Sequence, residues 1–84
     1  MSEIRNGYFV LSNTKHWHLV GDIYGDKRFP DGVDIVTSRV ISINAIGKDA
    51  IVKTRNSGYL IKDFEKTITS DMIKALEDSV DVVL

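Results

Sequence analysis

Two histidines and an aspartate stand close together in residues 16–22, and these side-chain types bind zinc or iron in proteins. His16 and His18 are two positions apart, so in an extended strand their rings point to the same side. Asp22 points to that side too, but it lies about 13–14 Å from His18 along the strand, too far for both to bind one ion. Because the chain has no third histidine, we predict two surface histidines and no metal site.

Phosphate binding and nucleophilic catalysis have their own sequence patterns, and neither pattern is complete here. Gly47-Lys48 matches the end of the phosphate loop G-x-x-x-x-G-K-[ST], but Ser42 stands at its first glycine position and Asp49 at its last position. No serine lies in a nucleophile elbow G-x-S-x-G, and no cysteine is present to act as a thiol nucleophile. We therefore expect no catalytic residue, no cofactor and no enzyme.

The composition predicts one soluble domain over residues 1–84. Hydrophobic residues make up 43% of the chain and charged residues 27%, which is typical of globular and not of disordered proteins. Without cysteine the chain has no disulfides, zinc fingers or iron–sulfur clusters, and it suits a reducing cytoplasm. The first residues are polar and no run of about 18 apolar residues exists, so we expect neither a secretion signal nor a membrane-spanning helix.

The net charge of −1 conceals an uneven distribution of charge along the chain. Residues 25–62 contain seven basic and four acidic residues, whereas residues 63–84 contain two basic and six acidic ones. The middle of the chain is therefore basic and its end acidic. This asymmetry indicates either two differently solvated faces or two faces that attract charged partners.

Hydrophobic alternation predicts a β-rich body over about residues 7–64. This body would position the histidines and the charged residues described above. Five strands are expected, at residues 7–13, 16–24, 34–46, 50–55 and 59–64. The third is rich in β-branched residues and too long to stay flat, so we expect a bend near residues 37–39. In the second strand, Trp17, Leu19 and Ile23 share one side, and we expect the sheet to curl around Trp17.

The end of the chain changes from strand to helix periodicity. Apolar residues recur at helical spacing and predict a helix over about residues 70–80, with Thr69 or Ser70 as its N-cap. The apolar tail, residues 82–84, is expected to pack on the body or on another chain. The predicted fold class is α+β: a strongly bent, half-barrel-like antiparallel meander of about five strands, with one C-terminal helix packed against it.

The longest connection, residues 25–33, carries the residue types that anchor protein interfaces. The acidic helical end offers a second candidate face. The predicted partner-binding residues are Tyr24, Lys27, Arg28, Phe29, Arg39, Glu77 and Asp78. A structural role is the alternative for each of them: Phe29 would fold into the core, and Arg28 and Arg39 would pair with nearby aspartates.

The connection belongs to a longer pattern. Residues 25–32 (GDKRFPDG) are followed by residues 37–39 (TSR) and residues 54–60 (TRNSGYL). This layout resembles small uncharacterised bacterial and phage-type proteins, in which a charged turn with P-D-G or E-D-G precedes a T-S pair and a hairpin ending in an aromatic residue. The resemblance covers about residues 17–61 and implies a fold pattern, without assigning a catalytic or binding residue.

These observations favour a small non-enzymatic protein-binding module. An inhibitor, immunity protein or anti-defence protein of a phage or mobile element needs only a rigid outer surface that occludes its partner. A second copy of the chain is another candidate partner, since an edge strand or the C-terminal tail can pair two copies into a homodimer.

Two other functions stay open. The first is a nucleic-acid-binding, barrel-like module whose exposed aromatic and basic side chains would be Tyr24, Phe29, Tyr59, Lys27, Arg28, Arg39, Lys53 and Arg55. An isoelectric point of about 6.0 disfavours it. The second is a small enzyme or metal-binding protein that uses His16 and His18.

Overall fold

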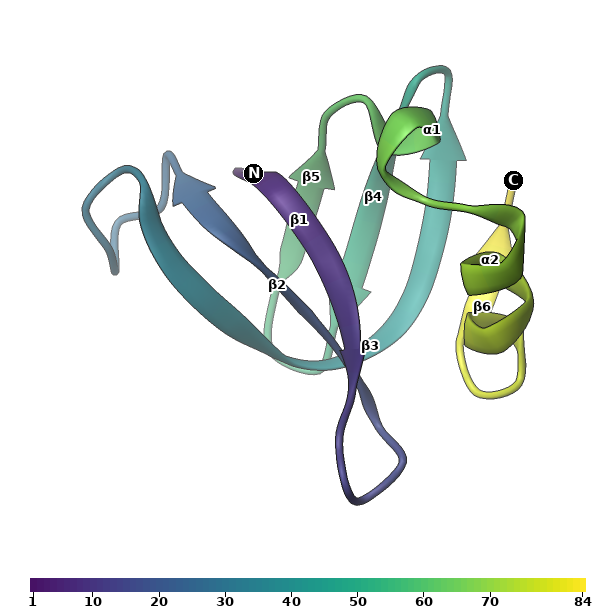
Figure 1. Cartoon of the computed structure of the whole chain (residues 1–84). Coiled ribbons are helices and arrows are strands. Elements are labelled where there is room, and N and C mark those ends of the chain that lie inside the picture. Colours follow the sequence, from purple (N-terminus) through teal and green to yellow (C-terminus); the bar gives the residue numbers. More distant parts are fainter.

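The strands form one curved sheet, and a short helical segment lies beside it (Figure 1). The computed structural model describes the backbone of residues 1–84 and every side chain except that of Thr67. Its elements are β1 (Ser2–Leu11), β2 (Trp17–Tyr24), β3 (Val33–Ile46), β4 (Asp49–Thr54), β5 (Gly58–Ile61), α1 (Phe64–Thr67), α2 (Ser70–Glu77) and β6 (Asp81–Val83). The predicted α+β class, a bent meander with a C-terminal helix, is confirmed.

The meander closes on itself. Each of the strands β1 to β4 pairs antiparallel with the next one in the chain. In addition, residues 2–4 of β1 pair parallel with residues 59–61 of β5, so the first and last strands of the meander meet. The predicted bent meander thus closes into a small barrel. The first strand begins at Ser2, earlier than predicted, because its polar N-terminal residues alternate around the single buried Ile4.

The predicted bend in the long third strand is confirmed. β3 pairs with β2 as far as Arg39 and with β4 from Val40 onward, so one strand serves both sides of the barrel. The pairing register shifts at this point, which is the signature of a β-bulge. The buried Thr37 hydroxyl accepts a hydrogen bond from the Leu19 amide at 3.1 Å, and this replaces a backbone bond that the bulge interrupts.

The core is mainly aliphatic, with Phe9, Tyr59 and Phe64 as its aromatic members, and it extends from the barrel to the C-terminal segment. Its largest fully buried side chains are Ile4, Leu19, Ile23, Ile43, Val52 and Leu76, drawn from four strands and α2. Trp17 is only partly buried and packs at the margin of this cluster. The expectation that the sheet curls around Trp17 is therefore wrong. Trp17 is the first residue of β2, and a ring at the end of a strand lies at the rim of a barrel.

Close packing between β1 and β2 depends on a glycine. A Cβ atom on Gly21 would lie 2.5 Å from Ile4 Cγ2 and 2.9 Å from the Arg5 carbonyl oxygen. Both distances are shorter than real carbon contacts, so no larger residue fits there without displacing β1. Gly21 faces the barrel interior at the place where β1 departs from regular pairing, between Arg5 and Tyr8.

The C-terminal segment adds a helix and a sixth strand. The helix is shorter than predicted and ends at Glu77, and its N-cap is Thr69, whose hydroxyl accepts a hydrogen bond from the Met72 amide at 3.2 Å. Leu76 and Val80 bury it against the barrel. β6 then pairs parallel with residues 42–44 of β3, so the prediction that the apolar tail packs on the body is confirmed for residues 82–83. No helix among the described residues is long and apolar enough to cross a bilayer.

Candidate functional site

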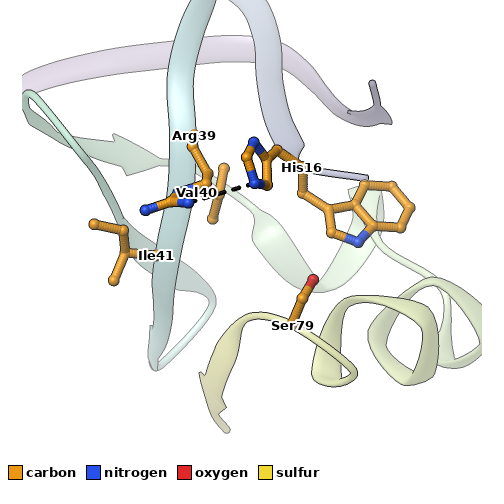
Figure 2. A pocket seen from close by; sticks show the side chains of 6 residues that line it. His16, Arg39, Val40, Ile41 and Ser79 are labelled. Carbon is orange, nitrogen blue, oxygen red and sulfur yellow. Dashed lines mark hydrogen bonds between the residues drawn. The ribbon is translucent and has the colours of Figure 1, made fainter. Parts of the chain in front are cut away.

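Two adjoining recesses open at the bend of β3. One has a volume of about 390 Å³ and is lined by His16, Trp17, Arg39, Val40, Ile41 and Ser79. The other has a volume of about 360 Å³ and is lined by His16, His18, Ser38, Arg39, Arg55 and Asn56. Because His16 and Arg39 line both, we treat the two as one site and call it the bend recess (Figure 2).

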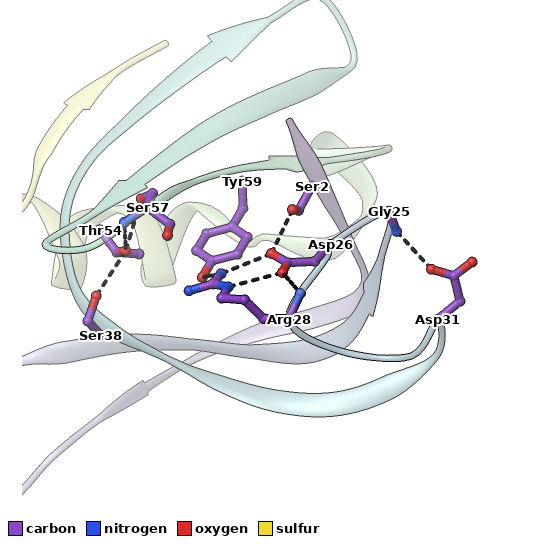
Figure 3. Close-up of polar contacts among 9 residues, drawn as sticks. All are labelled: Ser2, Gly25, Asp26, Arg28, Asp31, Ser38, Thr54, Ser57 and Tyr59. Atoms are coloured by element: carbon purple, nitrogen blue, oxygen red, sulfur yellow. Dashed lines mark hydrogen bonds and ion pairs between the residues drawn. The ribbon is translucent and has the colours of Figure 1, made fainter.

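A network of hydroxyl groups holds the backbone under the bend recess. The Ser38 hydroxyl donates to Thr54 Oγ1 at 3.0 Å and accepts a hydrogen bond from the Asn56 amide at 3.1 Å. Thr54 Oγ1 in turn donates to the Ser57 carbonyl at 2.9 Å and accepts from the Ser57 amide at 3.1 Å (Figure 3). These bonds tie the bend of β3 to the turn after β4. The T-S pair of the sequence pattern thus serves the geometry of the bend.

The network places two arginines side by side. The Arg55 amide donates to the Arg39 carbonyl at 2.9 Å, and both side chains line the bend recess. No acidic residue lines either half of this recess. Neither guanidinium forms an ion pair within the part of the chain that is described. Two arginines thus line a recess without an acidic side chain, and such an arrangement attracts anions.

The two histidines belong to the same recess, but they are held differently. His18 Nδ1 lies 2.9 Å from the Thr37 carbonyl oxygen, and because a carbonyl can only accept, Nδ1 carries the proton. His16 Nε2 lies 3.4 Å from an Arg39 guanidinium nitrogen, which donates to it while the imidazole is neutral (Figure 2). The Asp22 carboxylate accepts a hydrogen bond from the side-chain amide of Asn6 at 3.1 Å. Among the described residues, no group of three or more metal-binding side chains comes together.

A second feature lies on the outer face of β1, β2 and β3. Tyr8 pairs with Val20 and Val20 with Val36, so the three side chains form one row across the sheet. Tyr8 is 55% exposed and Val36 is 66% exposed, whereas Val20 between them is 7% exposed. Two residues further along β2, Asp22 stands directly opposite Asp34 on the same face. We call these five residues the docking face.

The loop between β2 and β3 is braced from within. Arg28 donates two side-chain hydrogen bonds to the Asp26 carboxylate, at 3.0 and 2.9 Å, and a third to the Tyr59 hydroxyl at 3.2 Å (Figure 3). Ser2 also donates to Asp26, at 2.8 Å. Hydrogen bonds from Arg28 hold the pKa of Asp26 far below its usual value, and the same contacts raise the pKa of Arg28. Arg28 thus has the structural role weighed for it from the sequence.

The other predicted partner-binding residues do not form one surface. Tyr24 lies at the end of β2 with the Arg5 guanidinium stacked 3.9 Å from its ring centre. Lys27 and Phe29 are exposed on the loop, and Arg39 belongs to the bend recess. Glu77 and Asp78 are exposed at the end of α2, on the opposite side of the molecule from the loop (Figure 1).

The exposed row of Tyr8 and Val36 and the place of Trp17 beside the bend were not predicted from the sequence. The outward position of Tyr8 depends on an irregularity in the register of β1 that the sequence pattern does not reveal. Val36 alternates with the half-buried Ile35, and that alternation is the signal that marks it as outward-facing. Trp17 lines the bend recess because it is the first residue of β2.

Comparison with known proteins returned no matching family model, no matching curated protein and no matching solved structure. The resemblance noted from the sequence pattern therefore stays a prediction.

Proposed function

We propose that this protein is a non-enzymatic binding module that covers a basic surface of a partner protein with its docking face. The observation that carries the proposal is the exposure of Tyr8 and Val36 in a row beside the paired carboxylates Asp22 and Asp34. Occlusion of this kind is how an inhibitor, immunity protein or anti-defence protein acts. The expected compartment is the cytoplasm, as the composition indicated.

The apolar row supports protein binding because its shape is set before any partner arrives. The three residues belong to strands that pair with one another in the closed barrel, and their side chains lie on its outer face. Because the strands hold the backbone in place, little conformational entropy is lost on binding. Tyrosine is among the residue types that contribute most to protein interfaces, while Val20 supplies a flat apolar floor between Tyr8 and Val36.

The carboxylates support a basic partner. Asp22 and Asp34 are directly opposed across β2 and β3, and Arg5 is opposite Asp22 on the β1 side. Neither carboxylate forms an ion pair among the described residues, so a lysine or arginine from the partner could pair with them, with Asp34 the more open of the two. A basic surface is typical of proteins that handle nucleic acid, and such a protein is the kind of target that we expect.

The accessible surface of the whole molecule is large enough for one standard interface. A standard interface covers about 800 Å² of each partner, roughly one seventh of the 5317 Å² accessible surface of this chain. The molecule is also broad and thin, with extents of 33, 31 and 17 Å. Surface contact is therefore the mode of binding that its shape favours.

The test removes the aromatic ring and the apolar character of the row and leaves residues that suit a strand. In the double variant Tyr8→Thr with Val36→Thr, both positions keep a side chain suited to a strand, but the apolar contacts are lost. We expect the affinity for a partner captured from the native host to fall about tenfold or more, measured by calorimetry with the purified partner.

The control is Ile46→Thr, which makes the same kind of change at the far end of β3, where Ile46 is 57% exposed. This variant should capture the partner as the unchanged protein does, and all variants should melt at nearly the same temperature. Equal affinity of the double variant and the control would contradict the proposal. The proposal would also be contradicted if the unchanged protein captured no protein from its native host.

A further inference from the structure

We propose that the bend recess is a nucleotide-binding site, with a phosphate group held between Arg39 and Arg55 and the base placed against Trp17. The site shares no residue with the docking face, and it would give the chain a second binding activity that does not depend on the proposed function. The shared chemistry is a phosphate ester attached to a planar base. A free nucleotide and a single-stranded nucleic acid both present it.

The arginine pair is the first reason. The Arg55 amide donates to the Arg39 carbonyl at 2.9 Å, both side chains line one recess, and no carboxylate lines it. An oxyanion within reach of both guanidinium groups would form a charge-assisted contact with each. Guanidinium groups match the geometry of phosphate oxygens especially well.

The fixed backbone under the arginines is the second reason. Ser38 and Thr54 use their hydroxyl groups to join the bend of β3 to the turn at Asn56 and Ser57. Four hydrogen bonds of 2.9 to 3.1 Å make up this junction. The two arginine backbones are therefore held in place before a ligand arrives, which reduces the entropy lost on binding.

The histidines line the same recess. The Thr37 carbonyl accepts from His18 Nδ1, so His18 Nε2 carries no hydrogen and can accept a hydrogen bond from an N–H group of a base. His16 is the group to which the Arg39 guanidinium donates at 3.4 Å, a distance at which a hydrogen bond is weak. Arg39 can exchange this contact for a phosphate oxygen at little cost.

The aromatic half of the recess favours a nucleotide over an acidic protein surface. Trp17, Val40 and Ile41 line the part that adjoins the arginines, and Ser79 lies across from them (Figure 2). An aromatic side chain beside a basic groove is the arrangement that binds single-stranded nucleic acid, because every base has a face that can stack. A carboxylate of a protein would use the arginines and leave the aromatic half empty.

The experiment uses the full chain and its only tryptophan as the reporter. Short single-stranded oligodeoxythymidine, thymidine monophosphate and poly-glutamate are titrated separately into the protein at low salt. We expect the oligonucleotide or the mononucleotide to quench Trp17 fluorescence. Binding should weaken as salt rises, with a slope of log affinity against log salt of about −0.7 for each phosphate held.

The site variant is Arg39→Gln with Arg55→Gln, and the matched control is Lys27→Gln with Lys53→Gln. Both remove two positive charges from exposed positions, but only the first pair lines the recess. We expect the site variant to lose affinity about tenfold or more and the control to lose much less, since hydrogen bonds to charged groups are lost only in the first. Melting curves show whether both variants remain folded.

Each outcome decides the proposal. Quenching by thymidine monophosphate supports a free-nucleotide site, and quenching by the oligonucleotide alone supports a single-strand site. Equal loss of affinity in the site variant and the lysine control would show general electrostatic attraction and overturn the proposal. Equal binding of poly-glutamate would assign the recess to an acidic protein, and no quenching by any ligand would leave no nucleotide site.

Discussion

Arg28 shows how much a residue's type leaves undecided. An arginine on an exposed loop can anchor a partner or brace its own loop, and the chain alone is compatible with both. In the structure the guanidinium forms three hydrogen bonds, to Asp26 and Tyr59, and the Asp26 side chain is 7% exposed. The loop between β2 and β3 is thereby joined to β5, so Arg28 braces its own loop, while its role in binding a partner stays a prediction.

The Asp26 carboxylate should make the stability of the protein depend on pH in the acid range. Its pKa is lowered in the folded protein, first by the side chain of Arg28, whereas an aspartate in an unfolded chain has a pKa of about 3.9. The stabilisation is therefore complete above that value and is lost as the pH falls toward the folded-state pKa. We expect Asp26→Asn to be less stable than the unchanged protein at neutral pH and to lose less stability on acidification.

Urea unfolding followed by Trp17 fluorescence, repeated between neutral and strongly acidic pH, measures this difference. Asp81→Asn is the control, because Asp81 is exposed and its carboxylate forms no hydrogen bond or ion pair among the described residues. Parallel pH profiles for Asp26→Asn and the unchanged protein would refute the assignment.

Among the elements, α2 illustrates a choice that the sequence left open. Thr69 and Ser70 are both good N-cap residues, and the structure selects Thr69, whose backbone is extended and whose hydroxyl accepts from the Met72 amide. Ser70 is the first residue of the helix itself. The choice depends on how Leu76 and Val80 dock on the barrel, since docking sets the rotation of the helix.

Thr69→Ala should therefore lower the free energy of unfolding by about 1 kcal/mol, the usual effect of losing an N-cap. Ser70→Ala removes a hydroxyl one residue later and should change it by less than about 0.5 kcal/mol. Urea denaturation of both variants measures the two values. A larger loss of stability for Ser70→Ala than for Thr69→Ala would contradict the assignment of Thr69 as the N-cap.

At the scale of the whole molecule, the decisive contact is the meeting of the first and last strands of the meander. Residues 2–4 pair with residues 59–61, and Ile4 is fully buried at this closure. The sheet has a free edge at β6, whose strand partner is β3. Closure leaves the outer faces as the surfaces on which both proposed activities are placed.

Ile4→Ala should lower the free energy of unfolding by about 2–5 kcal/mol, as expected for an aliphatic side chain removed from a full core. A chain of this length is stable by roughly 4–13 kcal/mol, so this loss is a large part of the total. Met1→Ala is the control at the same end of the chain, where Met1 is 79% exposed. Equal melting temperatures for the two variants would mean that the closure contributes little.

The sequence by itself determined the kind of fold. Alternation and β-branched residues predicted the strands, the unusual length of the third strand predicted its bend, and helical spacing predicted the last helix. These features are local, because the hydrophobic periodicity of a strand or a helix can be recognised from residues that are close together in the sequence. The basic middle of the chain was visible as well, and Arg39 and Arg55 both belong to it.

Only the tertiary structure decided which of these residues meet. The pairing of β1 with β5 joins residues more than fifty positions apart, and no local pattern predicts the partner of such a strand. The same holds for Arg39 beside Arg55, for Tyr8 in a row with Val36, and for Trp17 at the rim. Register and closure are properties of the whole sheet, because each depends on how every strand packs on the core.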